Sequence, residues 1–95
     1  MVDYRISESA KEDLIRIHHY GVKTFGLAQA DKYFNSLFKH FESIASNPLA
    51  FEAVDHIRIG YRRSICGVDS IYYRISDETI EIMAIVGKQN WLSLQ

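Results

Sequence analysis

Apolar and polar residues follow successive periods along this chain, and each period predicts one kind of element. Residues 2–6 alternate between apolar and polar side chains, the pattern of a half-buried strand. Ser9 and Glu12 then stand at capping-box spacing, which predicts that a helix begins there. Its apolar positions step by four and three residues up to about residues 20–22. Gly26 ends this helix, because glycine tolerates the left-handed geometry of a helix stop.

The second helix has the clearest pattern in the sequence. From Ala30 to Ala45 apolar residues recur at steps of three, four and one, which places aromatic side chains on one wide face. Pro48 follows, and proline both fails to continue a helix and disfavours helical geometry at the residue before it, Asn47. Because only a few residues around Gly26 separate the two helices, we expect them to form an antiparallel hairpin.

After Pro48 the period changes to two, in segments separated by turns: 56–59, 61–65, 70–75 and 79–86. The first two segments form two strands or one long strand bent at Gly60. Turns are expected at residues 67–69 and 76–78, and consecutive strands joined by short turns pair antiparallel. The sequence therefore predicts an α+β domain spanning 1–95. Its N-terminal strand and antiparallel two-helix hairpin pack on a small, mainly antiparallel β-sheet.

Composition favours a single folded domain without a general electrostatic affinity for nucleic acid. Ninety-five residues close only one core, and an apolar share of 47% with 13% aromatics argues against disorder. Residues 1–50 carry six Lys/Arg and six Asp/Glu, and residues 51–95 carry five and six. Neither half has the excess of positive charge that dominates affinity for a phosphate backbone, so an endonuclease is disfavoured.

Location and redox state follow from what the sequence contains. Its apolar runs are too short to cross a bilayer, and no signal-peptide pattern opens it. Cys66 is the only cysteine, so no intramolecular disulfide can form. We therefore expect a cytoplasmic protein in a reducing compartment.

The residue types that usually carry chemistry are not arranged for it. His18 and His19 diverge by about 100° on a helix and cannot share a metal, and neither His40 nor His56 has a partner at ligand spacing. Cys66 is expected to be a small buried hydrophobic residue. The sequence also has no glycine-rich phosphate loop and no paired-carboxylate motif. It predicts no catalytic residue, no metal and no cofactor.

Short motifs appear in a fixed order from about residue 4 to residue 90: Tyr4-Arg5-Ile6-Ser7, Asp13-Leu14, Phe25-Gly26, Gln29-Ala30, Asn47-Pro48, Gly60-Tyr61-Arg62-Arg63, Ile71-Tyr72-Tyr73-Arg74-Ile75 and Ile80-Glu81-Ile82. Together they resemble the ParE branch of the RelE/ParE toxin superfamily. The chain departs from the family pattern at Asp69 and Gly87, where members often carry a histidine, and at Ala84, where they often carry an arginine.

The resemblance implies the toxin of a type II toxin–antitoxin system, of the kind associated with plasmid stabilisation. ParE toxins are similar to RelE in fold but lack its RNA-cleaving residues; they bind DNA gyrase and trap it on cleaved DNA. A ParD-like antitoxin neutralises them by wrapping a tail around the toxin. The complex represses its own operon through the antitoxin, so DNA is reached only indirectly. No membrane and no small-molecule substrate is implied.

Two groups of residues are candidates for these contacts. Candidates for the target are Arg58, Arg62, Arg63, Lys88, Gln89, Asn90 and Trp91. The alternatives are solvated edge charges for the arginines and simple core packing for Trp91. Because side chains alternate across a strand, Arg62 and Arg63 are expected on opposite faces unless a bulge at Gly60 intervenes. The antitoxin is expected in a groove between hairpin and sheet, at Tyr33, Phe34, Leu37, Phe38 and Phe41.

Two other functions remain as alternatives. One is a RelE-like ribosome-dependent mRNA endoribonuclease that uses Arg63 and Lys88, with Tyr73 as a further candidate. The other is a non-toxic member that serves only as the antitoxin's partner in a repressor complex. The even charge balance and the missing acid–base set favour a protein that acts by binding.

Overall fold

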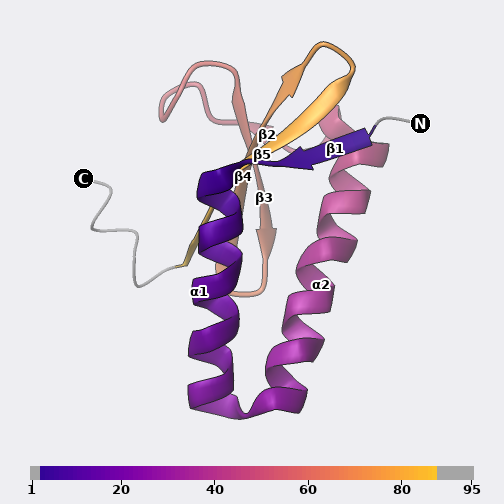
Figure 1. Ribbon diagram of the computed structural model, residues 1–95. Helices are drawn as coiled ribbons and strands as arrows, with labels where there is room; N and C mark the ends of the chain where they lie inside the picture. The colour runs from indigo at the N-terminus through magenta and orange to yellow at the C-terminus, as the bar shows by residue number, and fades with distance from the viewer. Residues whose placement is uncertain (1–2, 88–95) are drawn as a thin grey trace.

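In the computed structural model, which describes residues 3–87, two long helices lie on one face of a five-stranded sheet (Figure 1). The elements are β1 (Asp3–Ile6), α1 (Glu8–Phe25), α2 (Leu27–Ser46), a 3₁₀ turn η1 (Pro48–Ala50), β2 (Glu52–Ala53), β3 (Tyr61–Cys66), β4 (Asp69–Ser76) and β5 (Thr79–Gly87). The strand order is β1-β5-β4-β3-β2. β1 pairs parallel to β5, and the other pairs are antiparallel. The predicted α+β fold is confirmed.

Helix α1 is capped by Ser7, and the prediction that Ser9 caps it is wrong. The Ser7 hydroxyl oxygen accepts a hydrogen bond from the Ala10 amide at 3.1 Å, while Ser9 lies inside the helix. The Ser7 amide also donates to the Ile82 carbonyl at 3.0 Å. The backbone of Ser7 therefore continues the pairing of β1 with β5, while its side chain caps α1, so the helix begins directly after the strand.

The two helices form the predicted antiparallel hairpin, joined by a single residue (Figure 1). Gly26 adopts φ +92°, a conformation that side-chain-bearing residues rarely adopt, and it ends α1 and begins α2. Near the junction Gly21 lets the helices approach closely, because a Cβ there would lie 3.2 Å from that of Ala30. Helix α1 runs to Phe25, so the prediction that Gly26 ends this helix is confirmed.

Side chains of α1 complete the edge of β5 where β1 stops. The pairing of β1 with β5 ends at Ile6 and Ile82, so the following part of β5 has no strand on that side. The Ser7 hydroxyl donates to the Met83 carbonyl at 3.2 Å, and the Asp13 carboxylate accepts from the Ile85 amide at 3.0 Å. An unpaired strand edge exposes unsatisfied backbone groups, and here two helical side chains satisfy them.

Residues 56–59 form a turn, and the prediction of a strand there is wrong. The amides of Ile57 and Arg58 both donate to the Val54 carbonyl, at 2.8 and 3.1 Å. Gly60, at φ +85°, donates to the Asp55 carboxylate at 2.8 Å. These local bonds compete with strand pairing. Only the two-residue strand β2, which the sequence did not indicate, pairs with β3 on this side.

The core lies between the hairpin and the sheet. From the helices it takes Leu14, Leu37, Phe41 and Ile44; from the sheet it takes Cys66, Ile71, Tyr73, Ile80, Ile82 and Ile85. Within residues 3–87, neither helix is apolar enough over its length to cross a bilayer.

Replacing Asp13 by alanine is expected to free the Ile85 amide and lower the free energy of unfolding by about 1–3 kcal/mol, the usual cost of losing a hydrogen bond to a charged group. Hydrogen exchange of the Ile85 amide, followed by NMR, measures the effect directly. The neighbouring exposed Glu12 provides a matched control, since Glu12→Ala removes the same charge from the same turn. Equal exchange rates in the two variants would contradict the edge-satisfying role of Asp13.

Candidate functional site

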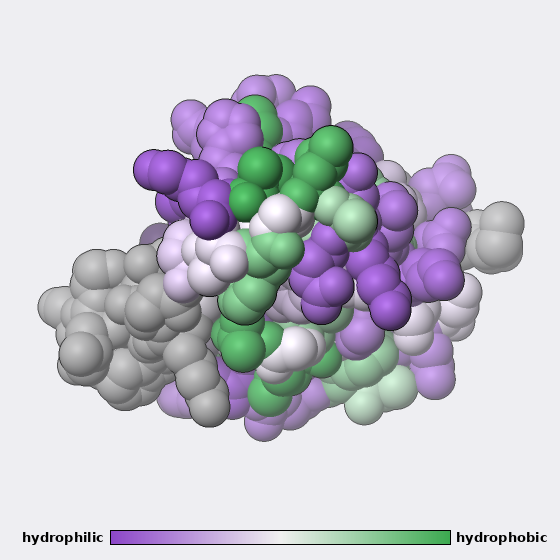
Figure 2. All heavy atoms as spheres, turned by 90° about the horizontal axis from the view of Figure 1, so that it is seen from below, coloured by the Kyte–Doolittle hydropathy of each residue, from purple (hydrophilic) through white to green (hydrophobic). Residues whose placement is uncertain are grey.

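A cavity of about 550 Å³ opens between the free end of the helical hairpin and the turn that joins β3 to β4. Its apolar wall includes Ile17, Phe25, Ala30 and Val68. Around it the hairpin end is unusually apolar: the exposed fractions of Tyr20, Phe25 and Leu27 are 55%, 66% and 61%. Figure 2, viewed from this end, shows apolar residues gathered on the face with polar residues around them. We call this cavity the hairpin pocket.

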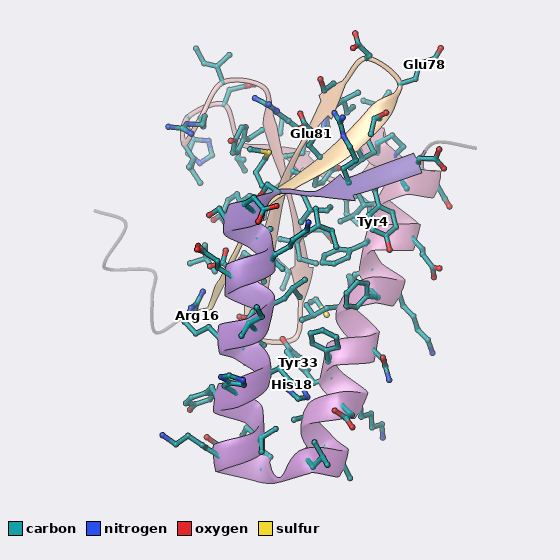
Figure 3. The ribbon with its side chains drawn as sticks, in the orientation of Figure 1. Tyr4, Arg16, His18, Tyr33, Glu78 and Glu81 are labelled. Carbon is teal, nitrogen blue, oxygen red and sulfur yellow. The ribbon has the colours of Figure 1, made fainter. Side chains whose placement is uncertain are left out.

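The hydrogen bonds of the Tyr33 hydroxyl form the polar floor of the hairpin pocket. The Tyr33 hydroxyl, which projects from α2 between the helices (Figure 3), lies 2.5 Å from the Asp69 carboxylate and 2.8 Å from the Cys66 carbonyl. Asp69, the first residue of β4, is only 5% exposed. Gly67 makes room for the ring, because a Cβ there would lie 2.9 Å from Tyr33 Cε1. Burial, the hydrogen bond to Asp69 and its charge raise the pKa of Tyr33 well above the ordinary value.

Two other titratable groups are buried and held neutral, Cys66 next to this floor and Tyr73 farther along β4. Burial raises the pKa of the Cys66 thiol, whose sulfur lies 3.8 Å from the Ser36 hydroxyl. Burial likewise raises the pKa of Tyr73, whose hydroxyl donates to the Pro48 carbonyl at 2.5 Å. A thiol must ionise to act as a nucleophile, so Cys66 contributes to packing. Within residues 3–87 no three His, Cys, Asp or Glu side chains come together to hold a metal ion.

The three candidate arginines do not form one patch. Arg62 pairs across the sheet with Tyr73, which places it on the helix face, and its guanidinium donates to the Phe51 carbonyl at 2.7 Å. Arg63 lies on the opposite, open face and donates through Nε to the Glu52 carboxylate at 2.7 Å. The Tyr72 hydroxyl and that carboxylate raise the pKa of Arg63.

Arg58 stands apart from both, in the turn between β2 and β3. Its guanidinium lies 5.7 Å from the centre of the Tyr61 ring, a cation–π distance. Two large apolar residues flank it in the turn, Ile57 at 49% exposure and Ile59 at 88%. Of the three candidate arginines, Arg58 is therefore the one that lies beside large exposed apolar side chains in a turn. The remaining target candidates, Lys88, Gln89, Asn90 and Trp91, lie outside the described residues.

The aromatic stripe of α2 divides between pocket and core. Tyr33 lines the hairpin pocket. Leu37 and Phe41 are fully buried against the sheet, so the prediction that they line a groove is corrected: they have no surface that a partner could touch. Phe34 and Phe38 are partly buried and pack on that core.

Sequence reasoning missed the part of the hairpin pocket that comes from α1 and from the β3–β4 turn. Periodicity places Tyr20 on the apolar stripe of the first helix and Phe25 at its end, and it places Val68 in a turn. A usable signal was present, because Phe25 and Leu27 place two large apolar side chains on either side of the linker Gly26. Such residues at the tip of a hairpin lie beyond the reach of a small sheet and indicate a contact surface.

Comparison with known proteins shows what the chain resembles as a whole. Residues 4–90 match the family model described as "ParE toxin of type II toxin-antitoxin system, parDE". The chain is 34% identical over 86 residues to Toxin ParE1 of Caulobacter vibrioides, covering 90% of this chain and 88% of that one. It is 31% identical over 84 residues to Toxin ParE1 of Mycobacterium tuberculosis, covering 87% and 86%.

A solved structure gives the same fold. A chain from the chromosomal ParDE toxin–antitoxin system of P. aeruginosa superposes with a TM-score of 0.80, covering 92% of this chain and 96% of that one at 18% identity. At this identity the likeness speaks for the fold alone.

Tyr33→Phe is expected to lower the free energy of unfolding by about 1–3 kcal/mol at neutral pH, because Asp69 and the Cys66 carbonyl lose their donor. It is also expected to flatten the loss of stability at high pH. Folded Tyr33 stays protonated while the unfolded side chain ionises near pH 10, so its contribution is full below about pH 10 and is lost as the pH rises further.

Urea unfolding between about pH 8 and about pH 11 tests this. Tyr4 and Tyr73 also have raised pKa values and remain in the variant, so a shallower slope is expected rather than none. Identical slopes for the two proteins would contradict the account of the pocket floor.

Gly67→Ala and Gly60→Ala form a matched pair that separates backbone strain from the contact with Tyr33. Both glycines have positive φ, +59° and +85°, so alanine at either is expected to cost about 1–2 kcal/mol of strain. Nothing lies within 4 Å of a Cβ at Gly60, whereas one at Gly67 meets Tyr33. Gly67→Ala is therefore expected to lose about 1–3 kcal/mol more in denaturant unfolding. Equal losses would contradict the close approach.

Proposed function

This chain belongs to the ParE toxin family, and we propose that it inhibits DNA gyrase by protein–protein binding while a ParD-like antitoxin neutralises it. The observation that carries the proposal is the match to the family over residues 4–90, nearly the whole chain. The site of action of such a toxin is the bacterial cytoplasm, where gyrase works.

The hairpin pocket supports the antitoxin part of the proposal. It is concave and largely apolar, and the exposed side chains of Tyr20 and Phe25 extend it along the hairpin end. Grooves of this kind receive one apolar face of an amphipathic helix or strand. A segment seated there also adds stability to a small domain, because it binds only the folded state.

The arrangement of polar groups supports inhibition by binding over cleavage of RNA. Cleavage requires an acid, a base and a phosphate-binding group around one reacting atom. Arg63 lies on the open face of the sheet with Glu52, while Tyr73 points into the core on the other face. These two cannot meet on one phosphate.

The β2–β3 turn offers a surface for the target. Arg58 lies between the exposed side chains of Ile57 and Ile59, and arginine beside apolar side chains is common at the centre of protein interfaces. The bond from Gly60 to Asp55 holds the turn in shape before any partner arrives. Little ordering of the backbone is then required on binding.

A supercoiling assay with purified gyrase tests the proposal, run beside a translation assay for cleavage of ribosome-bound mRNA. Inhibition of gyrase without cleavage is expected. Arg58→Ala is expected to raise the inhibitory concentration about tenfold, equivalent to ~1.4 kcal/mol, if the turn is a central contact. Lys32→Ala, which removes an exposed charge from α2, is the control and is expected to change nothing.

Other outcomes decide between the alternatives. Cleavage of mRNA that is lost in Arg63→Ala would contradict the proposal and favour an endoribonuclease. No effect in either assay, with tight binding to the antitoxin, would favour a member that serves only in the repressor complex.

A further inference from the structure

Asp69 is a buried carboxylate without a counter-ion among the described residues. It lines the hairpin pocket and is 5% exposed. Within residues 3–87 no Lys, Arg or His nitrogen lies within 4.0 Å of it. The ion pairs there use other carboxylates: Glu8, Asp13, Asp31, Glu52 and Glu81. Within the same residues, the side chain that donates a hydrogen bond to the Asp69 carboxylate is Tyr33, whose hydroxyl is neutral. A charge removed from water is costly unless it is paired.

Among residues 3–87, the cationic side chain in the pocket wall, Arg16, already pairs with another carboxylate. Arg16 lines the hairpin pocket, but its Nη2 lies 2.8 Å from Asp13 Oδ1. The other oxygen of Asp13 accepts from the Ile85 amide, so Asp13 is fixed and holds Arg16 with it. Moving Arg16 to Asp69 would break that pair.

The surroundings of Asp69 define what could pair with it. Ile17, Phe25, Ala30 and Val68 form the apolar wall of the pocket that Asp69 also lines. A ligand that satisfies both features has a cationic group with apolar groups beside it. An ion pair formed in the pocket is shielded from water. Charge-assisted hydrogen bonds are stronger in such surroundings than in solvent.

We propose that Asp69 makes the hairpin pocket selective for a lysine or arginine in the antitoxin segment that enters it, with apolar residues of that segment against the surrounding wall. The inference rests on the proposed function, because it takes the antitoxin as the occupant. The inference makes Asp69 a residue that determines which antitoxins this toxin accepts. An antitoxin with a neutral or acidic side chain opposite Asp69 would leave the buried charge of Asp69 unpaired.

A small probe tests the chemistry of the pocket in the full chain. Binding of 2-phenylethylamine is compared with binding of the neutral 2-phenylethanol, through NMR shifts of the Ala30 and Val68 amides. The amine is expected to bind at least about tenfold more tightly, and Asp69→Asn, which still accepts from Tyr33, is expected to remove the preference. Asp77→Asn is the matched control: it removes one charge at an exposed turn with φ +57°, which asparagine tolerates.

Two results of the probe experiment would overturn the inference. One is equal binding of amine and alcohol to the wild-type chain. The other concerns Lys88, which follows Gly87 of the pocket wall in the sequence. If Lys88→Gln strengthened binding of the amine, the chain's own lysine would be the partner of Asp69.

The antitoxin encoded beside the toxin gene tests specificity. Each Lys and Arg in its C-terminal half is replaced by Gln and measured against wild-type toxin, Asp69→Asn and Asp77→Asn. One basic residue is expected to couple with Asp69 by at least about fivefold in a double-mutant cycle and not with Asp77. An antitoxin that binds with no coupling to Asp69 would overturn this inference alone; an antitoxin that does not bind would overturn the proposed function.

Discussion

The structure depends on a hairpin that is longer than the sheet it covers. The inner stretch of α1 and α2 packs on β3, β4, β5 and β1, and there Leu14, Leu37, Phe41 and Ile44 of the helices are buried. Both helices then continue past the β3–β4 turn to Gly26 (Figure 1). Among residues 3–87 no strand reaches this end, so its apolar side chains contact one another and the β3–β4 turn and remain partly exposed. A small domain that leaves such a surface uncovered gains stability when a partner covers it.

The attachment of α1 to the sheet fixes where that uncovered surface lies. Ser7 and Asp13 bind the edge of β5 directly, so the helix cannot slide along the strand without losing these hydrogen bonds. The far end of α1 is thereby held opposite the β3–β4 turn. Asp69 and Gly87 face each other in the register of β4 and β5 at this end. They are also two of the three positions where the sequence departs from the pattern it resembles, so two of the three departures lie at the hairpin pocket.

Much of the fold could be predicted from periodicity, because apolar residues repeat at helical spacing in the hairpin and at alternate positions in the strands β3, β4 and β5. The segment 56–59 could not, since its alternating residues imitate a strand while Asp55 and Gly60 close a turn around them. The same limit applies to the site. Tyr33 was found because it lies on the helical stripe. The floor contact with Asp69 could not be found, because it joins residues from two elements whose register no local pattern reveals.

The central claim is that this protein acts as a binding surface whose most receptive part is the hairpin end. Hydrogen exchange of the toxin, free and bound to a ParD-type antitoxin, tests this most directly. We expect slower exchange in residues 16–33 and 66–69 of the complex, where the hairpin pocket lies. Protection confined to the open face of the sheet, with unchanged exchange in both of those segments, would contradict the account.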